Sequence, residues 1–183
     1  RNFTSDLKMF AQVAVYHALN DLYGSGVRPL GVTVYVSLQP AQSKIRANRL
    51  EHLMSGIYSA LGEIPLLNAH TAEGLETTVV VSAIGQKQKA VWSKQGLRAG
   101  CHLLLTKRLG TGVLLQAAMA GMLKSEWAEA LRLHLLEDHQ NLLNLEFDVL
   151  AATDISGFGL IGHLTEMLAG SAQGIKLSRS ALN

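Results

Sequence analysis

The chain of 183 residues is 48% hydrophobic and 16% charged, a balance that favours a globular protein with a sizeable core and argues against disorder. Its net charge of +2 comes from scattered basic residues and indicates neither a nucleic-acid nor a membrane partner. No stretch approaches the roughly 18 apolar residues of a membrane span. The single cysteine, Cys101, excludes an internal disulfide, is interpreted as a small core residue and fits a cytoplasmic location.

The first half of the chain predicts a sheet covered by helices. A helix that Thr4 or Ser5 can cap runs to about Tyr23, and residues 31–38 then alternate as a strand does. Residues 41–62 carry apolar side chains at helical spacing, which predicts a second amphipathic helix. The apolar run 64–67 leads into a polar corner at 68–71, and residues 77–84 predict another strand. These elements form one helix-on-sheet layer.

A polar, glycine-bounded stretch at residues 85–100 is the best candidate boundary. It divides the chain into an N-terminal domain, 1–88, and a C-terminal domain, 89–183. The second part predicts a strand at 102–106, a tight loop at 110–112 and a helix at 113–122. Two further helical segments follow, the first capped by Ser125 and the second at 142–147, and a strand, glycine loop and helix then occupy 149–168. We therefore expect a two-domain α/β protein.

Two carboxylates form the candidate site. Asp21 continues an apolar stripe at helical spacing, made of Leu7, Phe10, Ala14 and His17. On such a buried face an unpaired carboxylate would cost several kcal/mol, roughly, so Asp21 needs a partner. Asp154 lies where an apolar run meets a glycine-rich loop, and the two together suggest a shared cation site. A structural hydrogen bond for Asp21 and a turn or helix cap for Asp154 are comparably good alternatives.

Other motifs are weaker. His70 lies in the polar corner, where a nucleotide or metal role competes with an ordinary turn histidine. The Gly110-Thr111-Gly112 loop lacks the lysine of a P-loop, and no dinucleotide fingerprint follows the first strand. Neither zinc-ligand spacing nor a serine-nucleophile elbow is present. The residues by themselves lead to an α/β protein with a candidate cation site and a phosphate-friendly loop.

Three segments resemble selenophosphate synthetase, also called selenide, water dikinase: HALNDLY at 17–23, LLTKRLGTGV at 104–113 and ATDISGFGLIGHL at 152–164. The resemblance implies the fold of aminoimidazole ribonucleotide synthetase, in which the N-terminal sheet joins a partner's in a dimeric barrel beside a C-terminal α/β domain. It also implies a reaction in which ATP, selenide and water give selenophosphate, AMP and orthophosphate, with Mg²⁺ held by aspartates. Residues 72–76 and the Trp127 region resemble the form fused to an NADH dehydrogenase-like flavoprotein.

The same resemblance assigns roles to residues. Asp21 corresponds to an aspartate that contacts magnesium and ATP, and Asp154 to a magnesium aspartate. Ala69, His70 and Thr71 correspond to a Gly-His-Ser/Thr corner that contacts ATP from the neighbouring subunit. Ala69 departs from the family's glycine, and its methyl group stands where the backbone approaches phosphate or adopts a positive φ. The family's Cys or selenocysteine, essential lysine and two further aspartates precede Arg1, so we expect no catalytic residue and no activity in this chain alone.

Two other functions stay open at this point. One is a related ATP-dependent kinase of the same fold, such as thiamine-monophosphate kinase or the hydrogenase-maturation proteins. The other is a non-catalytic dimerisation or scaffold module of a fusion protein, which the altered glycines and the missing nucleophile favour. The segment TDISGFG at 153–159 favours the selenium enzyme. The sequence does not decide between Cys and selenocysteine, or between selenide and sulfide.

Overall fold

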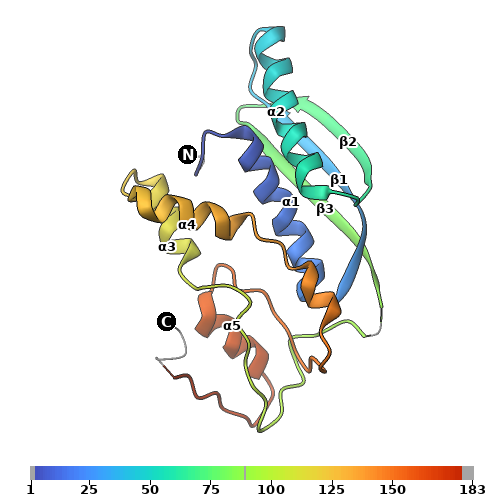
Figure 1. Cartoon of the computed structure of the whole chain (residues 1–183), viewed down its shortest axis with the longest axis vertical. Helices are drawn as coiled ribbons and strands as arrows, with labels where there is room; N and C mark the ends of the chain where they lie inside the picture. The colour runs from blue at the N-terminus through green and yellow to red at the C-terminus, as the bar shows by residue number, and fades with distance from the viewer. Residues whose placement is uncertain (1–2, 89, 179–183) are drawn as a thin grey trace.

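The computed structural model describes residues 3–88 and 90–178. In chain order its elements are α1 (Leu7–Gly24), β1 (Val27–Leu38), α2 (Ser43–Leu61), β2 (Leu66–Glu73), β3 (Thr78–Lys87), α3 (Thr111–Met119), α4 (Ser125–Leu135), the 3-10 helix η1 (Gln140–Asn144) and α5 (Gly159–Leu168). The sheet and its two long helices form the upper part of the molecule, and α5 lies in the lower part among long connecting segments (Figure 1).

Strand β1 is the centre of a three-stranded sheet, with β2 parallel on one side and β3 antiparallel on the other. The strands predicted at 31–38 and 77–84 are confirmed, although β1 begins earlier, at Val27. The predicted polar corner at 68–71 is wrong, because these residues belong to β2, where His70 pairs with Tyr35. An edge strand tolerates this polar stretch, since its backbone finds partners on β1 while its side chains stay in water.

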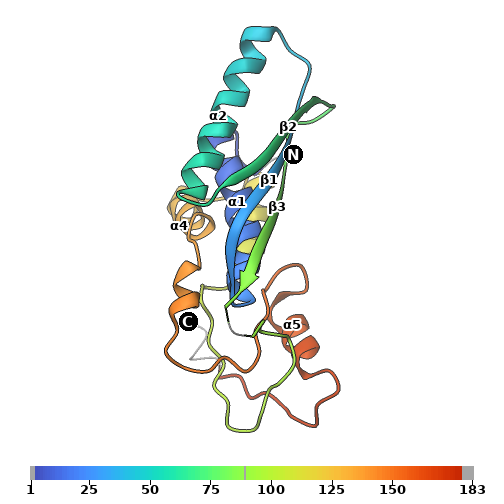
Figure 2. The same cartoon turned by 90° about the vertical axis from the view of Figure 1, so that its right-hand side faces the viewer.

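Alternation along β1 decides which face of the sheet is covered. Val32, Val34 and Val36 point into the core, whereas Tyr35 between them is 39% exposed. Figure 2 shows α1 and α2 on the same side of the sheet, with its other side uncovered. The core cluster consists of Ala11, Val15, Leu19, Tyr23, Val32, Val34, Val36, Leu38, Leu53, Ile57, Ala60 and Leu61.

The face of α1 that carries Asp21 is exposed, which corrects the expectation of a buried carboxylate. The buried stripe of this helix consists of Ala11, Val15, Leu19 and Tyr23. Both stripes have helical spacing, so periodicity alone does not choose between them. The approach of α2 does: Gly56 lies so close that a Cβ there would collide with the carbonyl of Lys8. That contact turns Asp21 and His17 toward solvent.

The N-terminal cap of α1 is Asp6 rather than Thr4 or Ser5. Its carboxylate oxygen accepts hydrogen bonds from the backbone N–H groups of Lys8 (2.9 Å) and Met9 (3.1 Å). We expect Asp6→Ala to lower the free energy of unfolding by about 1 kcal/mol, because two helix-end donors lose their partner. Urea denaturation followed by circular dichroism measures this change. Ser5→Ala is the matched control, and equal stabilities of the two variants would contradict the assignment.

The second half of the chain is built differently from the prediction. Its helices are confirmed in outline as α3, α4, η1 and α5, although Ser125 is the first residue of α4 rather than its cap. The strands predicted at 102–106 and before Asp154 are wrong, because residues 90–178 contain no strand. A strand needs a neighbour for its backbone groups, and here the apolar run lies in the open, with Leu104 68% exposed. The strands that make this an α/β protein therefore all come from the first half of the described chain.

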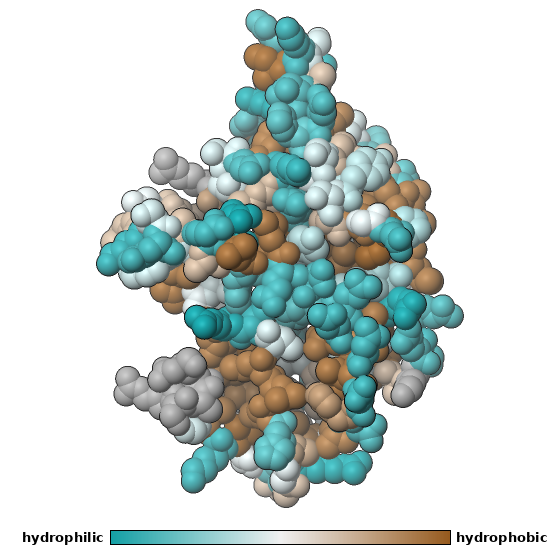
Figure 3. Space-filling model, in the orientation of Figure 1, coloured by the Kyte–Doolittle hydropathy of each residue, from teal (hydrophilic) through white to brown (hydrophobic). Residues whose placement is uncertain are grey.

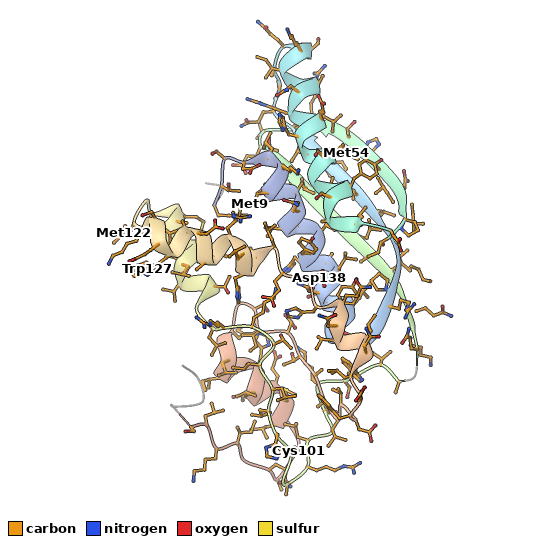
Figure 4. All side chains as sticks on the ribbon, in the orientation of Figure 1. Met9, Met54, Cys101, Met122, Trp127 and Asp138 are labelled. Carbon is orange, nitrogen blue, oxygen red and sulfur yellow. The ribbon has the colours of Figure 1, made fainter. Side chains whose placement is uncertain are left out.

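Apolar side chains remain at the surface of the second half. Phe158 is 76% exposed and Ile161 is 65% exposed, and Figure 3 shows an apolar area over this lower part of the molecule. Cys101 is exposed, which corrects its interpretation as a core residue, and it lies in a loop at the lower end (Figure 4). Over the described residues, each helix is too short or too polar to cross a bilayer.

Candidate functional site

The fold brings Asp21 and Asp154 close enough for their charges to interact. Partial burial raises the pKa of the Asp21 carboxyl, the charge of Asp154 raises it further, and nearby His17 opposes both effects. The turn after α1 and the loop that carries Asp154 are both bonded to residues 92 and 93, because the Trp92 N–H donates to the Ser25 carbonyl oxygen and the Ala152 N–H donates to the Ser93 carbonyl oxygen (both 2.9 Å). Asp21 lies on an exposed rather than a buried face, and the cation site that it would share with Asp154 stays a prediction.

The chain turns sharply just after Asp21. The hydroxyl of Ser25 donates to the Asp21 carbonyl oxygen (2.9 Å) and so closes the end of the helix. Gly26 follows with φ +69°, and a Cβ there would lie 2.8 Å from the indole ring of Trp92. Only glycine combines this backbone conformation with such close packing. The turn therefore fixes where α1 ends and where Asp21 stands.

The loop that carries Asp154 is held by a buried histidine. His163, on α5, is only 4% exposed. Its Nε2 accepts the backbone N–H of Ser156 (3.1 Å) and lies 3.3 Å from the Ser156 hydroxyl. Its Nδ1 lies 3.2 Å from the carboxylate of Glu166, which also accepts from Lys94 (2.7 Å). Since Nε2 acts as the acceptor, the network assigns the proton of the neutral ring to Nδ1.

Asn20 ties the two halves together next to Asp21, and Lys107 fastens the segment that Asn20 contacts. The Asn20 amide accepts from the backbone of His139 (2.9 Å) and donates to the Glu137 carbonyl (3.3 Å). The Lys107 ammonium donates to the carbonyl of His134 in the last turn of α4 (3.2 Å) and to that of Glu137 just past its end (2.6 Å). Partial burial lowers the pKa of Lys107, which the charges of Glu137 and Asp138 oppose. Sequence reasoning gave neither residue a role, although both lie inside the segments that carry the family resemblance.

Ala69, His70 and Thr71 form a separate group on β2. The His70 ring stacks on Tyr35 with centroids 5.9 Å apart, beside a shallow hollow of about 220 Å³ on the uncovered face of the sheet. Both views place β2 in the upper part of the molecule, away from α5 (Figures 1 and 2). No non-glycine residue in the described part of the chain has a positive φ, so the Ala69 methyl group causes no backbone strain. Within one chain, this group does not join the carboxylate pair.

The carboxylate pair fits a magnesium ion that also binds a substrate. Mg²⁺ is usually held by one or two carboxylates, with phosphate oxygens and water completing its octahedral shell. Asp21 and Asp154 are carboxylates of the kind that such an ion takes. The residues that the structure describes contain no cluster of three or more His, Cys, Asp or Glu side chains that could hold a metal by themselves. The arrangement therefore suits a metal–nucleotide complex better than a closed protein site.

Comparison with known proteins places both halves in one family. The family described as AIR synthase related protein, N-terminal domain, matches residues 1–86, and the C-terminal domain of the same description matches residues 98–182. The chain belongs to the AIR synthase-related family. The predicted α/β fold of that family is thus confirmed. The domain division at 88/89 stays a prediction.

Within the AIR synthase-related family, the resemblance to selenophosphate synthetase is confirmed by curated relatives. The chain is 36% identical to a selenide, water dikinase of Trichlorobacter lovleyi over 96% of the chain and 51% of that protein. It is 32% identical to that of Pelobacter propionicus over 92% of the chain and 49% of that protein. The chain spans about half the length of these relatives.

Solved structures show the same fold at lower identity. Thiamine-monophosphate kinase from Stenotrophomonas maltophilia K279a aligns with a TM-score of 0.74 and 22% identity, over 90% of this chain and 54% of that one. AaThiL complexed with AMPPCP and TMP aligns with a TM-score of 0.73 and 17% identity, over 91% of this chain and 56% of that one. These likenesses establish the fold and leave the substrate open.

Proposed function

We propose that this chain is part of an ATP-dependent selenide, water dikinase, which turns ATP, selenide and water into selenophosphate, AMP and orthophosphate. The observation that carries the proposal is that residues 92 and 93 bond to the turn after Asp21 and to the strand-free loop of Asp154, the two aspartates that come from segments resembling this enzyme. Curated relatives of that name, matched over more than nine tenths of the chain, support it.

Asp21 and Asp154 would hold Mg²⁺ against the phosphates of ATP. The metal, when bound, would neutralise charge on the phosphoryl groups that are transferred. The two aspartates would orient the nucleotide from two elements at once, the end of α1 and the loop before α5. We assign the residues of this chain the binding and orientation of the nucleotide, and we assign none of them the role of nucleophile.

A homodimer would add the group on β2 to the site of a second copy. Whereas its neighbours Ala69 and Thr71 alternate to the opposite face, His70 lies on the uncovered face of the sheet, apart from the carboxylate pair of its own chain. That face also exposes Val80 (49%) and Ile84 (53%). A second sheet packed on it would bury these apolar side chains and bring His70 to the interface, with Ala69 and Thr71 beside it on the edge strand. The proposed partners are thus ATP, selenide and a second copy of the chain. A fused flavoprotein domain and a cytoplasmic location stay predictions.

The polypeptide that contains this chain, assayed with ATP and Mg²⁺, tests the proposal. We expect AMP and selenophosphate to form only when selenide is present. Chromatographic separation of the nucleotides detects AMP, and ³¹P NMR detects selenophosphate. Phosphorylation of thiamine monophosphate without any response to selenide would favour the related kinase. A protein that neither binds nor consumes ATP would favour the scaffold module. Either result would overturn the dikinase assignment.

A further inference from the structure

We propose that residues 92–94 act as a clamp that sets the separation of the Asp21 and Asp154 carboxylates, with His163 as the positioning residue on the Asp154 side. The proposal rests on the proposed function in one respect, namely that the two carboxylates share a cation. Neither the clamp nor His163 touches that cation. Both act through the backbone on which the carboxylates stand.

Trp92 holds the Asp21 side. Its backbone N–H donates to the carbonyl oxygen of Ser25 (2.9 Å), the residue whose hydroxyl closes the helix end at Asp21. Its indole ring fills the space that the missing side chain of Gly26 leaves. Backbone and ring together fasten residue 92 to the turn that follows Asp21.

Ser93 and Lys94 hold the Asp154 side from both flanks. The Ser93 carbonyl oxygen accepts from the backbone N–H of Ala152 (2.9 Å), two residues before Asp154. Lys94 forms an ion pair with Glu166 (2.7 Å), and Glu166 contacts His163. His163 in turn accepts from Ser156, two residues after Asp154. Three consecutive residues therefore connect the two aspartates. Trp92 binds the turn after Asp21, and Ser93 binds the backbone before Asp154. Lys94 reaches the backbone after Asp154 through Glu166 and His163.

Positioning is the role that this geometry favours over a general contribution to stability. The Lys94 and Glu166 side chains are 48% and 37% exposed, and ion pairs this exposed contribute little to folding. The Glu166 carboxylate instead controls the tautomer of His163. By accepting a hydrogen bond from Nδ1, it keeps the proton on that nitrogen and leaves Nε2 able to accept from Ser156. A cation that needs both aspartates binds more tightly when their separation is set in advance.

The test measures the dissociation constant of Mn²⁺, a probe for Mg²⁺, by electron paramagnetic resonance on the full-length protein, together with its Tm. We expect Lys94→Met and His163→Asn to weaken Mn²⁺ binding about tenfold, as removal of groups behind metal ligands commonly does. Lys94→Met should leave Tm nearly unchanged. His163→Gln should restore much of the affinity, because its side-chain oxygen reaches the place of Nε2, whereas the shorter asparagine reaches only that of Nδ1.

Arg132→Met is the matched control, because Arg132 forms an equally short and exposed ion pair with Glu129 on α4 (2.7 Å). It should bind Mn²⁺ like the wild-type protein. Wild-type affinity in Lys94→Met and His163→Asn, alongside lost binding in Asp21→Asn, would overturn the clamp and leave the cation site standing. If the wild-type protein has no Mn²⁺ site that depends on Asp21, both the clamp and the proposed cation site are overturned. If His163→Asn fails to fold, Lys94→Met decides.

Discussion

Asp21→Asn is expected to abolish Mg²⁺-dependent ATP binding by the full-length protein, and Asp154→Asn to weaken it by at least about tenfold. Each substitution keeps the size of the side chain and removes one of the two charges that would hold the metal. The double variant should be no worse than Asp21→Asn, because two ligands of one ion act as a unit. Isothermal titration calorimetry with ATP, with and without Mg²⁺, measures these affinities.

Asp148→Asn is the control for this series, because Asp148 is exposed and lies in the segment that precedes the same loop. It should bind Mg²⁺ and ATP as the wild-type protein does. Unchanged affinity in Asp21→Asn would show that the coupled carboxylates are a structural feature only. Loss of binding in Asp148→Asn as well would point to a general effect of charge.

The raised pKa of Asp21 predicts how pH acts on the metal-free protein. The pKa of this carboxyl is higher in the folded than in the unfolded state, chiefly through burial and then through Asp154. The ionised form therefore disfavours folding, and stability should fall as pH rises from the unfolded pKa through the folded one. Mg²⁺ should offset this fall, and Asp21→Asn should remove it. Thermal melts between about pH 3.5 and 6, with and without Mg²⁺, test the sign.

Val80→Asp is expected to dissociate the proposed homodimer. Val80 lies on the uncovered face of the sheet beside Tyr35 and His70. A carboxylate there would be buried without a partner when two sheets pack together, at a cost of several kcal/mol, roughly. Light scattering after size-exclusion chromatography should therefore report half the wild-type mass. ATP affinity should fall with it, because the β2 group would no longer reach a second copy.

The control for this surface is Leu75→Asp, a residue between β2 and β3 that is 94% exposed. The same change in charge and polarity at Leu75 should leave the dimer intact. A wild-type protein that is monomeric, or a Val80→Asp variant that keeps the wild-type mass, would contradict the packing of two copies through this face.

Local patterns predicted the helices and the sheet of the first half well. The alternation of Val32, Val34 and Val36 marks a strand with one buried face, and this pattern depends only on neighbours in the chain. The strand predicted at 102–106 fails for the opposite reason, since an apolar run forms a strand only beside another strand. His70 was placed in a corner because polarity resembles a turn, whereas pairing with β1 makes it part of an edge strand.

The sequence by itself determined the two acidic residues, their places at element ends, the helical and alternating periodicities, and the segments that indicate the family. Tertiary structure alone decided which stripe of α1 is buried, since Gly56 lets α2 approach on one side. It also decided that residues 92–94 bond both to the turn after Asp21 and, with His163, to the segments around Asp154. Periodicity reports on residues a few positions apart, whereas contacts between distant segments depend on how whole elements pack.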